Sequence, residues 1–261
     1  MSNNPIPNLF IVGFPRSGTT SIHNYLNKHK EIKMSDIKEI GFFCDDFKES
    51  TYVSERWPCP KNIEEYLSFF EEGPERYIGE STPFYIFSKV AARNIYSFNS
   101  ESKLLISIRE PLDFLISLYQ WNRMKSKSKR ETFSEFINRD VKMKSDEEGN
   151  YESVLERTNY ANYLKSYLNA FPKENIKIIL YDNLKQNTEK EYEDILSFLE
   201  LPSTHVRRFE IHNKGMSDLG LKTKALDENI LKKLKNYSKE TSNLLLDYGL
   251  INESLYKRWY G

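Results

Sequence analysis

A short apolar run near the N-terminus leads into a glycine-bounded loop, and the loop opens onto a helical pattern. The run is residues 9–12, Leu-Phe-Ile-Val, and the loop is residues 13–20, Gly-Phe-Pro-Arg-Ser-Gly-Thr-Thr. The apolar residues Ile22, Tyr25 and Leu26 then recur at the three- and four-residue steps of a helix. A strand, a tight loop and a helix N-terminus together present backbone N–H groups and the positive end of a helix dipole to an anion. This segment therefore predicts an α/β fold that binds a phosphate group at the loop.

The loop is similar to a Walker A loop but departs from it at one position. Gly13 and Gly18 keep the Walker A spacing, whereas Thr19 stands where that motif has its lysine. The basic residue has moved inside the loop, to Arg16. A nucleoside triphosphatase needs the lysine on its terminal phosphates. The loop is therefore predicted to bind a phosphate but to be poorly suited to hydrolysing ATP or GTP.

Strand-like and helix-like patterns alternate along the rest of the chain. The expected strands are residues 9–12, 77–79, 104–108 and 176–181, and the expected helices are residues 19–28, 84–96, 112–124 and 192–199. Buried strands that are separated by helices predict a parallel β-sheet with helices on both of its faces. Ligands of such sheets bind beyond the carboxyl ends of the strands, where the loop lies.

Size and composition indicate a single domain, residues 1–261, with residues 123–148 as a charged insertion or subdomain. The chain has 38 basic and 38 acidic residues, so no positive field points to nucleic acid. Cys44 and Cys59 fit neither a metal site nor a disulfide framework. Because the sequence shows no signal peptide and no apolar run of membrane-spanning length, a cytoplasmic protein is expected. Trp57 is interpreted as a packing residue.

A second phosphate contact is predicted at the end of the strand formed by residues 104–108. Arg109 follows this run, Pro111 stands at a favoured first helical position, and Ser117 lies two turns into the next helix. The arginine and the serine can converge on one phosphate, with a bidentate charged contact from the guanidinium and a neutral contact from the hydroxyl. The alternative is an arginine that caps the strand end and a serine that faces solvent.

These two features together resemble the phosphate sites of the sulfotransferases that use 3′-phosphoadenosine 5′-phosphosulfate (PAPS). Residues 13–20 resemble their 5′-phosphosulfate loop, and Arg109 with Ser117 resembles their 3′-phosphate site. Lys214 and Gly215, in a predicted loop, resemble the lysine-glycine pair that closes over the nucleotide in such enzymes. The resemblance implies a P-loop-type, sulfotransferase-like fold. The PAPS-binding residues that it implies are Arg16, Ser17, Gly18, Thr19, Thr20, Arg109, Ser117, Lys214 and Gly215.

Residues 38–43, Lys-Glu-Ile-Gly-Phe-Phe, resemble an element of the glycan sulfotransferases related to the heparan sulfate enzymes. The resemblance implies that Glu39 is the general base that takes the proton of the acceptor hydroxyl, with Lys38 beside it in the catalytic set. Residues 80–85 resemble a second element of this branch, but Ser81 replaces a lysine that helps to bind an acidic glycan in those enzymes. Gly41 and Cys44 stand where the heparan enzymes have a histidine and an aspartate, so the base is kept but a heparan-type substrate does not follow.

The resemblance as a whole implies an enzyme that moves the sulfuryl group of PAPS to an acceptor hydroxyl by in-line displacement. The acceptor is expected to be a glycan or a small alcohol, and no metal is expected to take part. His205 and His212, near the late loop, are alternatives to Glu39 as the base, because some sulfotransferases use histidine. Two other interpretations stay open: a P-loop kinase or other nucleotide phosphotransferase, and a non-catalytic nucleotide-binding protein on the same fold.

Overall fold

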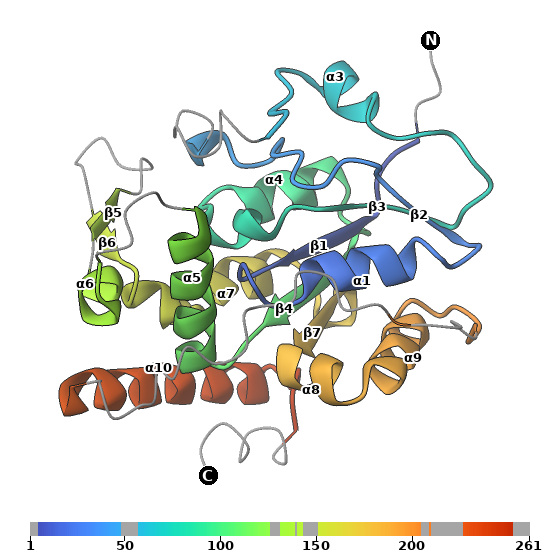
Figure 1. The fold of residues 1–261 in the computed structure, drawn as a ribbon. Helices are drawn as coiled ribbons and strands as arrows, with labels where there is room; N and C mark the ends of the chain where they lie inside the picture. Colours follow the sequence, from blue (N-terminus) through green and yellow to red (C-terminus); the bar gives the residue numbers. More distant parts are fainter. Residues whose placement is uncertain are drawn as a thin grey trace.

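Five parallel strands form the central sheet of the protein, in the order β2-β3-β1-β4-β7 (Figure 1). Their bounds are Leu9–Gly13 (β1), Ile32–Met34 (β2), Tyr77–Ser81 (β3), Lys103–Ile108 (β4) and Ile176–Leu180 (β7). The computed structural model describes residues 5–47, 57–125, 131–138, 140–142, 151–204, 209 and 227–252. All four pairings between neighbouring strands of this sheet are parallel, as the alternation of strands and helices predicts.

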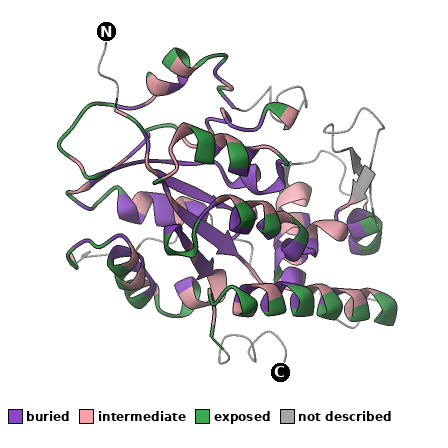
Figure 2. Ribbon diagram, turned by 180° about the vertical axis from the view of Figure 1, so that it is seen from behind, coloured by how far each residue is buried: buried purple, intermediate pink, exposed green. Residues whose placement is uncertain are grey.

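Successive side chains of each strand point to opposite faces of the sheet, and each face has its own apolar core. On β1, Leu9 and Ile11 pack in one core, whereas Phe10 and Val12 pack in the other. The helices of the first core are α1 (Thr19–Leu26), α8 (Tyr181–Gln186) and α9 (Thr188–Phe198). Those of the second include α4 (Ala91–Phe98), α5 (Pro111–Lys125), α7 (Tyr160–Ala170) and α10 (Glu228–Asp247). The predicted α/β architecture with helices on both faces is confirmed, and Figure 2 shows the buried strands between helices whose outer sides are exposed.

The shorter elements connect or extend these layers. They are η1 (Asp45–Phe47), α3 (Ile63–Leu67), η2 (Pro83–Phe87), α6 (Phe133–Asn138), β5 (Asp140–Lys142), β6 (Tyr151–Ser153), η3 (Glu156–Thr158) and η4 (Lys173–Asn175). Strands β5 and β6 form an antiparallel pair apart from the main sheet. Within the charged segment 123–148, Phe133, Phe136 and Ile137 are buried in the same core as α5. This part of the segment therefore packs with the rest of the domain.

The expected continuous helix over residues 84–96 is wrong, because the chain breaks between η2 and α4. Ser88 takes an extended backbone conformation, with ψ 133°. Its hydroxyl oxygen accepts the N–H groups of Val90 (3.2 Å) and Ala91 (3.0 Å), and the hydroxyl donates to Asp46 Oδ1 (2.6 Å). A serine that caps the following helix with its side chain ends the preceding helical turn. The helix over residues 112–124 is confirmed as α5, and it begins at Pro111 as predicted.

The strand order brings the predicted site residues to one edge of the sheet. β1 lies between β3 and β4, with Gly13 aligned with Ser107 and Ile11 aligned with Ser81. Since all strands run the same way, the loop after β1, the turn after β3 and Arg109 after β4 share the carboxyl edge. Tyr181 follows β7 at the same edge.

Candidate functional site

The phosphate loop, residues 13–20, is a tight turn that depends on two glycines. Gly13 has φ 138°, and a Cβ atom there would lie 2.2 Å from the carbonyl oxygen of Ser107 on the neighbouring strand. Gly18 has φ 85°, and a Cβ atom there would lie 2.8 Å from the side chain of Leu184. Both positions are left-handed or otherwise closed to side chains, so glycine is required at each. Arg16 also has a positive φ, 68°, and completes the turn.

Helix α1 begins directly after Gly18, so its first backbone N–H groups face the inside of the loop. The first amides of a helix have no carbonyl partner within it, and Gly18 supplies no side-chain cap. Ser17 is completely buried, its carbonyl accepts the Ser107 hydroxyl, and its own hydroxyl has no hydrogen-bond partner among the described residues. A buried hydroxyl beside a helix N-terminus whose N-cap residue has no side chain fits an anionic ligand.

Arg16, Arg109 and Ser117 meet beside this loop. Arg109 Nη1 donates to the carbonyl oxygen of Arg16 at 3.1 Å, and Arg16 Nε donates to Ser117 Oγ at 3.4 Å. The Arg109 guanidinium also lies over the ring of Tyr181, 4.6 Å from its centre. Arg109 and Ser117 thus both contact Arg16, one at its carbonyl oxygen and the other at its guanidinium group.

Arg16 and Arg109 form no ion pair within the described part of the chain. Arg109 Nε is buried and has no hydrogen-bond partner there. Burial lowers the pKa of Arg16, and repulsion from Arg109 lowers it further. Two close cations with unused donors form a site for an anion that carries more than one negative charge.

Lys38 brings an ammonium group to the N-terminus of α1 from a different loop. Its Nζ donates to Thr20 Oγ1 at 2.8 Å. Burial lowers the pKa of Lys38 to about 8, and the neighbouring Glu39 opposes this shift. His23 on α1 is buried too, and this burial, with repulsion from Lys38, lowers its pKa to about 4. The chain therefore has a cation next to the loop even though Thr19 replaces the Walker A lysine.

Glu39 follows the edge strand β2 and lies at the same carboxyl edge of the sheet, next to the end of β3. Its backbone has φ 62°, its N–H donates to the carbonyl of Ser81 at 2.9 Å, and its side chain is half-buried. Trp57 donates from Nε1 to Glu39 Oε2 at 2.9 Å. The interpretation of Trp57 as packing is therefore incomplete, since it is buried but also orients a carboxylate. No local pattern reveals this contact, because 18 residues separate the two positions.

Some of the predicted site residues are not part of the described structure. Lys214, Gly215, His205 and His212 all lie outside the described residues. In the described ranges no three acidic, histidine or cysteine side chains gather as a metal site would require. No helix in those ranges is long and apolar enough to cross a membrane.

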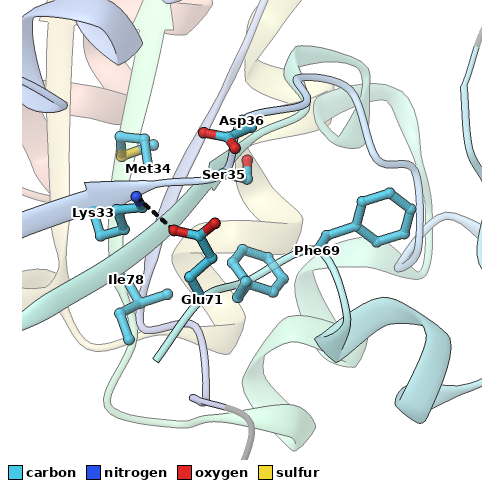
Figure 3. A pocket seen from close by; sticks show the side chains of 8 residues that line it. Lys33, Met34, Ser35, Asp36, Phe69, Glu71 and Ile78 are labelled. Atoms are coloured by element: carbon cyan, nitrogen blue, oxygen red, sulfur yellow. Dashed lines mark ion pairs between the residues drawn. The ribbon is translucent and has the colours of Figure 1, made fainter. Parts of the chain in front are cut away.

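A small hollow at the edge strand β2 is separate from the phosphate loop. Figure 3 shows that it is lined by residues that follow α3, among them Phe69 and Glu71, and by the end of β2. Lys33 and Glu71 form an ion pair across it at 2.9 Å. Lys33 and Glu71 therefore neutralise each other, whereas Arg16 and Arg109 form no ion pair with a described residue.

The fold and the site define an α/β protein that binds an anionic ligand at the carboxyl edge of its parallel sheet. A protein-family model for the sulfotransferase domain matches residues 7–242, and the chain belongs to this family.

Among curated relatives, the membrane-associated sulfotransferase kil1 of Dictyostelium discoideum is 31% identical over 141 residues, which are 52% of this chain and 28% of that protein. Heparan sulfate glucosamine 3-O-sulfotransferase 5 of Mus musculus is 27% identical over 197 residues, 76% of this chain and 54% of that protein. The chain thus spans about half or less of the length of these two relatives. A sulfotransferase crystal structure from Alicyclobacillus acidocaldarius has the same fold, with a TM-score of 0.76, 23% identity and coverage of 97% of this chain and 99% of that one.

Proposed function

We propose that the protein is a PAPS-dependent sulfotransferase that acts on the hydroxyl group of a glycan or a small alcohol. The observation that carries the proposal is the pair of guanidinium groups of Arg16 and Arg109 beside a phosphate loop, neither of which forms an ion pair with a described residue. PAPS has a phosphosulfate at one end of its ribose and a separate phosphate at the other. It supplies an activated sulfuryl group. Membership of the sulfotransferase domain family and the heparan sulfate relatives support this choice of donor and acceptor class.

The phosphate loop is proposed to hold the 5′-phosphosulfate. The amides of Gly18, Thr19 and Thr20 are the proposed donors at the start of α1, and the Ser17 hydroxyl is an additional one, whereas the Ser17 N–H already donates to the Phe14 carbonyl at 3.2 Å. Arg16 and Lys38 stabilise the negative charge that grows on the oxygen left behind when the sulfur–oxygen bond breaks. Preorganised donors of this kind typically contribute a few kcal/mol each to transition-state stabilisation. In this role Lys38 replaces, from a neighbouring loop, the lysine that the Walker A motif carries.

The second phosphate is proposed to bind Arg109 and Ser117. Arg109 keeps its Nε proton available, and the ring of Tyr181 holds its guanidinium plane. Ser117 adds a hydroxyl that is buried at the side of the same cluster. A contact this far from the reacting sulfur uses binding energy to fix the orientation of the nucleotide. Lys214 and Gly215 complete the nucleotide site in this proposal.

Glu39 is proposed to be the general base. As the acceptor oxygen forms its new bond to sulfur, its proton passes to the Glu39 carboxylate, while the electron pair of the broken bond stays on the departing phosphate oxygen. Trp57 fixes one carboxylate oxygen, Oε2, which leaves Oε1 to accept the proton. Ser81, whose buried hydroxyl has no hydrogen-bond partner among the described residues, replaces the lysine of the heparan branch, so a less acidic acceptor than heparan is expected. The absence of a metal and a cytoplasmic location remain predictions from the sequence.

The experiment that tests this function compares nucleotides by thermal shift, with and without Mg²⁺. 3′-Phosphoadenosine 5′-phosphate (PAP) should raise the unfolding temperature much more than ADP does, and Mg²⁺ should not change either shift. At a concentration a hundredfold above its dissociation constant, PAP adds about 2.7 kcal/mol to the free energy of unfolding. Equal temperature shifts for PAP and ADP would contradict the 3′-phosphate site. A larger shift for ATP with Mg²⁺ than for PAP would indicate a kinase.

A further inference from the structure

The turn that carries Glu39 is held in an unfavourable backbone conformation. Glu39 has φ 62° and Gly41 has φ 77°, so two of three consecutive residues are left-handed. A residue with a side chain takes this conformation only where the surrounding structure enforces it. One restraint lies at the start of the turn, where the Glu39 N–H donates to Ser81, and another lies at Ile40, whose carbonyl accepts the Cys59 N–H at 2.9 Å. At the end of the turn, Asn94 Nδ2 donates to the Phe43 carbonyl at 3.2 Å, and the backbone N–H groups there have a restraint of their own.

That restraint is the hydroxyl group of Tyr85. Tyr85 Oη accepts the N–H of Phe42 at 2.9 Å and the N–H of Phe43 at 3.4 Å. The same hydroxyl donates its one proton to Glu80 Oε1 at 3.1 Å. A phenol has one proton and two acceptor sites, so all the hydrogen-bonding capacity of Tyr85 is used. Because backbone N–H groups can only donate, the Tyr85 proton has to point at Glu80.

Glu80 is completely buried, on β3 beside Ser81, and its carboxylate accepts hydrogen bonds from three hydroxyl groups of the described residues. Tyr66 donates to Oε1 at 2.8 Å and Thr82 donates to Oε2 at 2.6 Å, in addition to Tyr85. No lysine, arginine or histidine pairs with Glu80 among the described residues. A buried carboxyl without a cation costs stability, and burial raises the pKa of Glu80 to about 7. A packed apolar residue at this position would avoid that cost, so the carboxyl has to be explained by what it orients.

We infer that Glu80 is a positioning residue for Glu39: it orients the Tyr85 hydroxyl, which fixes the end of the turn on which the base is carried. β3 then controls the turn at both ends, since Ser81 holds its start and Glu80, through Tyr85, holds its end. This inference rests on the proposed function, because it assigns a catalytic effect to a residue that touches no substrate. It predicts that loosening the turn slows transfer and leaves nucleotide binding unchanged.

The test compares Tyr85→Phe with Tyr66→Phe. Both variants remove one phenol hydroxyl from the same Glu80 oxygen and keep the ring, but only Tyr85 contacts the backbone of residues 42 and 43. Hydrogen exchange of a peptide that spans residues 39–44 should accelerate in Tyr85→Phe and stay as in the parent protein in Tyr66→Phe. This measurement needs neither PAPS nor an acceptor. Equal exchange in the two variants would overturn the inference.

Kinetics then separate positioning from a general loss of structure. With PAPS and an acceptor found in a screen of hydroxylated glycans and small alcohols, Tyr85→Phe should lower kcat by about tenfold to a hundredfold, because small misplacements of a catalytic group have effects of this size. Its affinity for PAP should stay within about twofold of the parent, and Tyr66→Phe should keep the parent kcat. Glu80→Gln should keep most of the activity, since its amide oxygen can still accept the Tyr85 proton. If Glu80→Gln and Glu80→Ala lose activity equally, the orienting role is wrong.

A double variant distinguishes failure of this inference from failure of the proposed function. When Glu39→Gln has already removed the base, adding Tyr85→Phe should lower kcat by less than about twofold, because the two effects act through one group. A full additional loss would overturn the positioning role. If Glu39→Gln alone keeps the parent kcat, the proposed base is wrong instead, and the exchange measurement still decides whether Tyr85 holds the turn.

Discussion

Replacing Arg109 with alanine should weaken PAP binding strongly and ADP binding only slightly. The proposed role of Arg109 is to bind the 3′-phosphate, which ADP lacks. The side chain is half-buried at the sheet edge, and its Nε has no partner among the described residues, so a phosphate there is held by a desolvated charge. Removing such a charged partner costs roughly 2–5 kcal/mol of binding free energy, which corresponds to about a 30-fold to 4,000-fold rise in the dissociation constant.

The structure also indicates that Arg109→Ala should change nucleotide binding at the phosphate loop only slightly. Arg109→Ala removes the hydrogen bond to the Arg16 carbonyl, a loss of about 1 kcal/mol, but it also removes the cation that repels the Arg16 guanidinium. These effects oppose each other, so the affinity for ADP should change by less than about tenfold. The ratio of the PAP and ADP dissociation constants is therefore the quantity to measure.

Isothermal titration of both nucleotides measures this ratio directly, and thermal shift provides a second readout. Ser117→Ala is the matched control at the same site, because it removes a neutral hydroxyl and should weaken PAP binding by only about 1 kcal/mol. If Arg109→Ala binds PAP like the parent protein, the second phosphate lies elsewhere. If it loses PAP and ADP binding equally, Arg109 supports the phosphate loop rather than a 3′-phosphate.

Three further predictions follow from the charges of the site. Arg16→Ala should lower kcat by about a hundredfold or more with a smaller effect on PAP affinity, as steady-state kinetics and titration would show, and a pure loss of affinity would contradict the role of Arg16 in the transition state. Activity should fall as the pH rises through about 8, where Lys38 loses its proton. Lys38→Arg stays protonated and should move this fall in activity to higher pH, whereas an unchanged pH profile would exclude Lys38 as the group responsible. Burial raises the pKa of Glu80 from 4.5 to about 7, so between these pH values Glu80 is protonated in the native state but ionised in the unfolded state. The unfolding free energy of the parent therefore falls as the pH rises through this range. In denaturant unfolding, the unfolding free energy of Glu80→Gln minus that of the parent should therefore rise by up to ~3 kcal/mol between pH 4 and pH 8. If this difference stays constant with pH, Glu80 does not titrate in that range.

The parts of the structure that could be predicted from the sequence are those fixed by neighbouring residues. The phosphate loop is encoded by Gly13 and Gly18, which stand where the chain leaves no space for a side chain. The apolar run 104–108 identified β4, and Pro111 after it identified the start of α5. The same local geometry, a strand end followed by two helical turns, places Arg109 and Ser117 where both contact Arg16.

The parts that could not be predicted depend on contacts between distant segments. β2 has only three residues, and its apolar pattern is too short to be distinguished from a loop. The break at Ser88 depends on Asp46, which is 42 residues away in the sequence. The contact of Trp57 with Glu39 and the hydroxyl network of Glu80 depend on tertiary packing in the same way. These residues lie near segments that resemble elements of known enzymes, but no sequence pattern indicated their contacts.

The most direct test of the account measures the transfer of radiolabelled sulfur from PAPS to a hydroxyl acceptor by the parent protein and by Glu39→Gln. Acceptors for the test come from a screen of hydroxylated glycans and small alcohols. The account predicts transfer without added metal, and a drop of about 10²–10⁴-fold in turnover for Glu39→Gln with nearly unchanged PAP affinity. A Glu39→Gln protein that keeps most of its activity, while His205→Ala or His212→Ala abolishes it, would contradict Glu39 as the base. A parent protein that binds PAP but transfers no sulfur to any of these acceptors would contradict the proposed reaction.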